Sequence, residues 1–151
     1  MNPMNITVDR DFKLEFLNYL KANAHNDIWT DKEIYIASNF DNDENEWFYI
    51  QLGHNECGDC FHLELGADKV LCFHIEKYDI LSKRQCIAAF NDLKNESAFA
   101  DFEPDNEWNE WIDGMGMEYK HDIKTKEELF DLMIKIFSNT NDLLSNYKFH
   151  Q

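Results

Sequence analysis

The sequence predicts an α+β protein in which an antiparallel sheet of about four to six strands carries helices packed on one face. Three segments, residues 46–53, 60–65 and 69–76, alternate apolar and polar side chains, as half-buried strands do. Segments near both ends of the chain instead place apolar residues three or four apart, which is typical of amphipathic helices. With 151 residues, including 12 Phe, 6 Tyr and 4 Trp, the chain can bury a core, and we expect a single domain over residues 1–151.

The N-terminal third is predicted to contain a helix between two strands. Residues 1–8 form a short lead-in that can include an edge strand through Ile6 and Val8. Asp9 or Asp11 can cap the helix that follows. Residues 33–40 are predicted as the first strand of the main sheet, and residues 41–46 as an acidic turn. The apolar face of the helix would consist of Phe12, Phe16, Leu17 and Leu20.

The register of the three central strands follows from their alternation, because a slip of one residue would turn every apolar side chain outward. For Leu63 to share a face with Phe73, the numbers of paired residues must sum to an even number such as 136, which requires a loop of three or five residues. His62 then lies opposite His74. Pairing the first two strands on the same principle places Gln51 beside His62. The second face then carries the other side chains, most of them polar: Trp47, Tyr49, Gln51, Cys60, His62, Glu64, Cys72, His74 and Glu76.

The remaining elements are predicted from periodicity and punctuation. A second helix of about sixteen residues would include both Ile80 and Leu93. Residues 97–102 and 117–123 are predicted as short strands, and residues 103–114 as a segment broken at Pro104. Thr125 and Glu128 have capping-box spacing and begin a final helix, which either stops near Asn139 or continues through Leu143, Leu144 and Tyr147.

The net charge of −16 is concentrated in two parts of the chain. Residues 41–76 contain nine acids and one base, and residues 97–119 contain seven acids and no base. Such a field repels nucleic acid and anionic lipid and accelerates association with a basic protein. No apolar run is long enough to cross a membrane, and the first residues do not have the pattern of a signal peptide. With four cysteines best interpreted as reduced thiols, we expect a cytoplasmic protein.

The sharpest chemical motif is Cys57-Gly-Asp-Cys60, which has the spacing of a zinc knuckle. His54 and His62 flank it, so these four residues, or a set that includes His74, could bind one zinc ion. There is no second Cys-x-x-Cys pair, and the alternative is two ordinary reduced thiols. We favour that alternative and expect no cofactor.

Two other constellations are weaker. The histidines and glutamates predicted on the polar face could act as an acid–base site, but no nucleophile or phosphate-binding loop accompanies them. Residues 41–45 begin like a calcium loop, yet Glu46 occupies the position that requires glycine and Leu52 the position of the bidentate glutamate. We therefore expect a protein that is not an enzyme.

Residues 103–113 interleave acids with two tryptophans, Trp108 and Trp111. Interfaces favour tryptophan as an anchor with charge around it, although both indoles could equally belong to the core. If the segment were a helical turn, the two rings would share a face. The candidate partner-binding residues in the two acidic segments are Asp41, Asp43, Glu44, Glu46, Glu103, Asp105, Glu107, Trp108, Glu110, Trp111 and Asp113.

In its size and its two acidic segments, residues 41–46 and 101–113, the chain resembles the acidic immunity proteins that bacteria make against their own nuclease toxins. It is also similar in charge to proteins that imitate DNA. The first resemblance implies one-to-one binding to a basic toxin and occlusion of its active site. Three alternatives stay open: a zinc-binding or hydrolytic enzyme using His54, Cys57, Cys60 and His62, a DNA mimic, and a plain interaction module.

Overall fold

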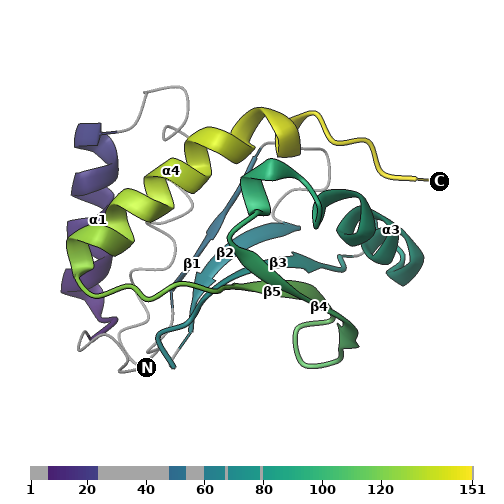
Figure 1. Cartoon of the computed structure of the whole chain (residues 1–151), viewed down its shortest axis with the longest axis horizontal. Helices are drawn as coiled ribbons and strands as arrows, with labels where there is room; N and C mark the ends of the chain where they lie inside the picture. Colours follow the sequence, from purple (N-terminus) through teal and green to yellow (C-terminus); the bar gives the residue numbers. More distant parts are fainter. Residues whose placement is uncertain (1–6, 24–47, 54–59, 67, 79, 151) are drawn as a thin grey trace.

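The computed structural model describes residues 7–23, 48–53, 60–66, 68–78 and 80–150 and contains a five-stranded antiparallel sheet covered on one face by helices (Figure 1). The predicted α+β class and the predicted number of strands are confirmed. The strands are β1 (Phe48–Gln51), β2 (Phe61–Leu65), β3 (Leu71–Glu76), β4 (Phe102–Asn109) and β5 (Gly114–Tyr119). The helices are α1 (Arg10–Asn23), α3 (Lys83–Leu93), the 3₁₀ helix η1 (Ser97–Phe99) and α4 (Lys126–Ser145).

The strands lie in the order β1-β2-β3-β5-β4, with every neighbouring pair antiparallel. His62 lies opposite His74, and Gln51 lies opposite His62, so the predicted register is confirmed. The backbone N–H of Glu76 donates to the carbonyl of Cys60 at 2.9 Å, which continues the same register beyond β2.

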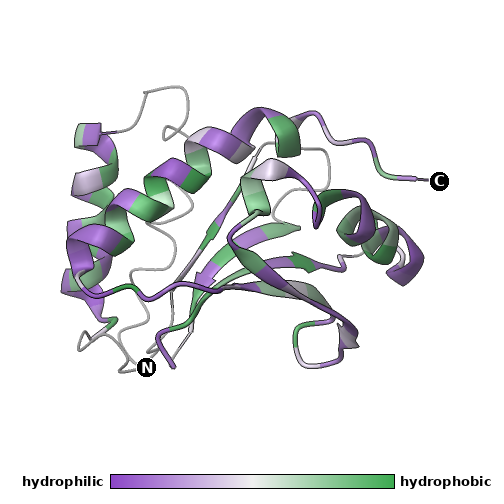
Figure 2. Cartoon of the chain, viewed as in Figure 1, coloured by the Kyte–Doolittle hydropathy of each residue, from purple (hydrophilic) through white to green (hydrophobic). Residues whose placement is uncertain are grey.

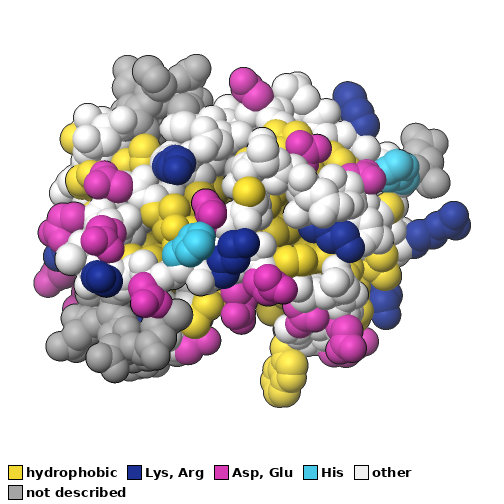
Figure 3. Space-filling model, viewed as in Figure 1, with side chains coloured by type: hydrophobic (Ala, Val, Ile, Leu, Met, Phe, Trp, Pro, Cys, Tyr) yellow, Lys and Arg dark blue, Asp and Glu magenta, His cyan; other side chains and the backbone are white. Residues whose placement is uncertain are grey.

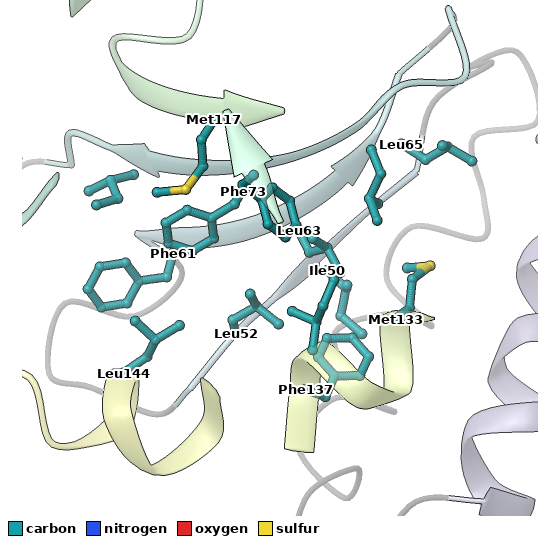
Figure 4. Packing of buried hydrophobic residues seen from close by; sticks show 14 of the residues in the cluster. Ile50, Leu52, Phe61, Leu63, Leu65, Phe73, Met117, Met133, Phe137 and Leu144 are labelled. Atoms are coloured by element: carbon teal, nitrogen blue, oxygen red, sulfur yellow. The ribbon is translucent and has the colours of Figure 1, made fainter. Parts of the chain in front are cut away.

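Hydrophobic and hydrophilic residues alternate along the strands (Figure 2), and the strand side chains labelled in Figure 4 point toward the layer that contains Phe137 and Leu144 of α4. Phe137 and Leu144 of α4 pack near Ile50 and Leu52 in this layer (Figure 4). Gly53 ends this part of the chain with φ at 70°, and a Cβ atom there would lie 2.7 Å from Cβ of Leu144. Glycine is therefore required for α4 to approach the sheet.

Two side-chain caps begin helices where the sequence predicts them. The carboxylate of Asp9 accepts a 2.9 Å hydrogen bond from the Phe12 N–H at the start of α1. Thr125 Oγ1 accepts from the Glu128 N–H at 3.1 Å at the start of α4. In a complete capping box the Glu128 side chain would accept from the N–H of Thr125; here it accepts instead from the N–H of Lys124, one residue earlier. Aromatic rings then join α1 to α4, with Phe12 and Phe130 centroids 5.4 Å apart.

The predicted second helix is too long. The chain after β3 begins α3 only at Lys83, because Ser82 forms a complete capping box with Gln85, and the helix has 11 residues. Ile80, which was assigned to the apolar face of this helix, precedes it and is 63% exposed. A capping signal therefore overrides helical spacing at this position.

The predictions for residues 97–123 are wrong in their boundaries. Residues 97–99 form the helix η1 in place of a strand, and the following strand extends from Phe102 to Asn109 through Pro104. Proline is tolerated because β4 is the outer strand of the sheet. The strand predicted over residues 117–123 is β5, which begins three residues earlier, at Gly114, and ends four residues earlier, at Tyr119.

Several predictions fall outside the described residues: the strand over residues 33–40, the acidic turn over residues 41–46, and Ile6. Val8 is buried, but its backbone belongs to no strand. None of the helices described is long and apolar enough to cross a membrane.

Candidate functional site

The face of the sheet turned away from the helices, called the polar face here, is rich in carboxylates. The five strands contain six acidic side chains and neither lysine nor arginine. Glu103 and Glu118 are directly opposite each other on adjacent strands, an arrangement that opposes folding. The register places side chains in two rows across the sheet, Tyr49-Glu64-Cys72-Glu118-Glu103 and Gln51-His62-His74-Gly116-Asp105.

The centre of the polar face is the imidazole of His62, which is only 3% exposed. Its Nδ1 atom lies 2.5 Å from Glu76 Oε2, and its Nε2 atom lies 3.3 Å from the hydroxyl of Tyr78. When Nδ1 carries the hydrogen, it donates to the carboxylate, and Nε2 accepts from the tyrosine hydroxyl. The ring of Tyr49 meets the same imidazole edge-on at 5.4 Å. These contacts hold His62 in one orientation and link Glu76, His62 and Tyr78 in a row.

His74 lies beside this group on the neighbouring strand. Its buried Nδ1 atom is 2.9 Å from Glu64 Oε2 and 3.9 Å from Glu76 Oε2. The nearer contact is an ion-pair contact whose angles are not those of a hydrogen bond. Gly116 makes room for the ring, because a Cβ atom at that position would lie 2.7 Å from His74 Cδ2. Two histidines and two glutamates therefore alternate across β2 and β3.

The thiol of Cys72 lies in the same layer. Burial, together with the carboxylates of Glu118, Glu64 and Asp68, raises its pKa to about 12. At neutral pH this group is therefore a protonated thiol, which is a poor nucleophile and a poor metal ligand.

The loop between β4 and β5, residues 110–113, is fixed by backbone contacts at both ends. The N–H of Trp111 donates to Asn109 Oδ1 at 2.9 Å, and the carbonyl of Asp113 accepts from the N–H of Lys77 at 2.8 Å. Asp113 has φ at 51°, in the left-handed region. The side chain of Trp111 is 98% exposed at the end of this hairpin.

Two cavities lie on the polar face, and Ile112 from the β4–β5 loop lines both of them. The larger, the aromatic cavity, has a volume of about 410 Å³ and is also lined by Tyr49, His62, Glu64, Glu76, Tyr78, Trp111 and Asp113. The smaller, the acidic cavity, has a volume of about 280 Å³, and its polar lining is Cys72, His74, Glu103, Asp105, Glu107, Asn109 and Glu118.

The structure separates the two tryptophans of the predicted interface. Trp108 is half-buried against the core, and the Nζ atom of Lys83 lies 4.9 Å from its ring centroid. Trp111 is exposed, and the segment is a strand and a turn, so the helical turn in which both rings would share a face is not formed. The predicted acids of this segment are all exposed: Glu103, Asp105, Glu107, Glu110 and Asp113.

The described residues include none of the acidic turn and only part of the zinc motif. Asp41, Asp43, Glu44, Glu46, His54 and Cys57 lie outside them. Cys60 is fully buried within the hydrophobic cluster, and His62 contacts Glu76 and Tyr78. In the part of the chain that the structure describes, no three His, Cys, Asp or Glu side chains converge to hold a metal ion.

The residues of the site that were not predicted include Glu118, Tyr78 and Ile112. Tyr78 continues the alternation of His74 and Glu76 beyond the end of β3, so its period of two could have revealed it. Ile112 contacts the polar face only because the β4–β5 loop bends back, and no local pattern indicates that bend.

Charge is unevenly distributed over the surface (Figure 3). Acidic side chains lie around the β4–β5 hairpin at the lower right of that view and also over α1 and α4 at its left, whereas several basic side chains lie over α3 and the C-terminal segment.

Comparisons of the chain with protein-family models, with curated proteins and with solved structures find no match.

Proposed function

We propose that this chain is an acidic binding protein that neutralises a basic protein partner, acting as an immunity protein that blocks a bacterial nuclease-type toxin by occluding its active site. One observation carries the proposal: the five described strands contain six carboxylates and neither lysine nor arginine, and they adjoin a tryptophan that is 98% exposed.

The carboxylates of the polar face affect both the stability of the isolated protein and the kind of partner that it can bind. Carboxylates on neighbouring strands repel each other, so the arrangement lowers the stability of the isolated protein. A partner with a basic surface relieves the repulsion on binding and is also attracted from a distance. Trp111 supplies the large apolar contact that anchors such interfaces. A nuclease fits this description because its own substrate groove must attract phosphate.

The proposal is tested with a basic nuclease encoded beside the gene for this chain. Its activity is measured with rising amounts of the purified protein, and we expect inhibition that is complete at one equivalent. Fluorescence competition with a nucleic-acid substrate should show that the protein and the substrate exclude each other. Unchanged nuclease activity in excess protein, for every basic nuclease encoded nearby, would refute the proposal.

A second function, a zinc-binding or hydrolytic enzyme, is supported by the hydrogen-bonded chain of Glu76, His62 and Tyr78, which could transfer a proton. If it is correct, the purified protein should retain about one equivalent of zinc after dialysis, and chelation should lower its melting temperature. We expect neither result under the first proposal. Zinc analysis by mass spectrometry therefore separates the two functions.

A further inference from the structure

We infer that the aromatic cavity is a receptor for one arginine side chain of the basic partner. This inference rests on the proposed function, since it names the group on the partner that the polar face recognises. The cavity has a volume of about 410 Å³, within the usual range of ligand sites of about 300–1,000 Å³.

The charge of the cavity selects a cation. Glu64, Glu76 and Asp113 line it, and none of its lining residues is lysine or arginine. Glu64 and Glu76 are 26% and 24% exposed, so a group entering from solvent can reach their oxygens. Each carboxylate has two oxygens and can accept further hydrogen bonds beyond its contact with a histidine.

The shape of the site favours an extended cation over a metal ion. The described acidic, histidine and cysteine side chains do not converge in groups of three that could hold a metal. The carboxylates are instead distributed around a cavity. A guanidinium group carries five N–H donors in one plane and can bridge separated carboxylate oxygens, which a compact ion cannot do.

The aromatic lining favours arginine over lysine. Tyr49, Tyr78 and Trp111 contribute rings to the cavity, and planar guanidinium groups stack on such rings. His62 makes edge-to-face contacts with both tyrosines, at interplanar angles of 87° and 66°, which hold their rings in place before a ligand arrives. Trp111, at 98% exposed, is accessible to a partner. The acidic cavity lacks a tyrosine or tryptophan and therefore has no comparable preference.

The inference can be tested without the toxin. The protein, labelled with ¹⁵N, is titrated with N-acetyl-arginine methylamide and, in parallel, with the citrulline and lysine derivatives, while backbone and indole N–H signals are recorded. We expect the arginine derivative to shift signals of Tyr49, Tyr78 and the Trp111 indole, with half-saturation on the order of 1 mM. The citrulline derivative, which has the same shape without the charge, should produce no saturable shift.

Two variants and one matched control locate the site. Glu64→Gln keeps an acceptor for His74 but removes a charge, and we expect it to weaken arginine binding at least about fivefold. Trp111→Ala should weaken binding similarly through the lost stacking surface. Glu127→Gln removes an exposed carboxylate of α4 that lines neither cavity, and should leave binding within about twofold.

The results separate this inference from the function that it extends. No saturable shift up to about 50 mM, equal binding of citrulline, or an unchanged affinity in Glu64→Gln would each overturn the arginine site. Equal binding of the lysine derivative would overturn the preference for a planar cation. Inhibition of the toxin without arginine binding would refute this inference alone. Arginine binding without inhibition of any basic nuclease would refute the proposed function alone.

Discussion

Removing charge from the β4–β5 hairpin should slow association with the basic partner without unfolding the protein. The change is the quadruple amide Asp105→Asn, Glu107→Gln, Glu110→Gln and Asp113→Asn. All four side chains are exposed. Asp105 Oδ1 accepts a 3.1 Å hydrogen bond from the Glu107 N–H, a contact that asparagine can also make. Asp113 has φ at 51°, which asparagine adopts as readily as aspartate. The backbone should therefore be unchanged.

The expected magnitude follows from the number of charges on this face. The five strands and the β4–β5 loop carry eight carboxylates, of which the variant removes four. Electrostatic steering raises on-rates by about 10- to 10³-fold. If its logarithm is proportional to the charge, removing half of the carboxylates slows association by about 3- to 30-fold at low ionic strength. Because screening acts beyond about 8 Å at physiological salt, the loss should shrink as salt is added.

The assay is stopped-flow association at low and physiological ionic strength, with thermal unfolding as a test of integrity. A matched control, Glu96→Gln, Asp122→Asn, Glu127→Gln and Asp142→Asn, removes the same charge from exposed positions outside the polar face. It should change the on-rate by less than about twofold. Equal on-rates for the two quadruple variants, or an on-rate of the hairpin variant that does not depend on salt, would show that the polar face does not steer binding.

Three further predictions concern single residues. Thr125→Ala removes the acceptor for the Glu128 N–H and should cost about 1 kcal/mol in urea unfolding; an unchanged midpoint would contradict the cap. The pKa of Cys72 is raised to about 12, so the thiol ionises at a lower pH in the unfolded chain than in the folded protein. The free energy of unfolding should therefore fall above about pH 9, by up to about 1.4 kcal/mol per pH unit. Cys72→Ala should lack this contribution to the pH dependence, and identical pH dependence in the two proteins would contradict the shift. Trp111→Ala should change the free energy of unfolding by less than about 0.5 kcal/mol while weakening partner binding. Trp108→Ala should lower the melting temperature, because the Trp108 ring packs against the core. Equal losses of stability in the two variants would contradict these different roles.

Period-two alternation was sufficient to predict the centre of the site. It placed His62 opposite His74 and assigned the glutamates of β2 and β3 to the same face, because a buried apolar face excludes a slip of one residue and a short loop limits the remaining choices. It could also have included Tyr78. The contact of His62 with Glu76 at 2.5 Å depends on side-chain rotamers across two strands, which alternation does not determine.

The hairpin of β4 and β5 could not be predicted in the same way. The sequence of β4 is polar and contains a proline, so it lacks the pattern by which strands are predicted. An outer strand can have such a sequence, because it needs few apolar residues and tolerates proline. A register shift between Asp105 and Asn109 interrupts its alternation as well. The position of the β4–β5 loop beside the polar face depends on long-range contacts such as the hydrogen bond from the Lys77 N–H to the Asp113 carbonyl, which the local sequence does not encode.

The two faces of the sheet explain how one set of strands can carry a destabilising charge. Each strand contributes buried apolar residues to the layer under α4 and α3, and this burial is the main stabilising contribution. Side chains on the other face contribute little to the core, so repulsion between groups such as Glu103 and Glu118 is tolerated. Glu76 lies against His62, and Glu64 lies against His74. Glu103 and Glu118 are exposed, and the neighbouring described strands contain no lysine or arginine. The charge that is not balanced within the protein is therefore the part that a basic partner would complement.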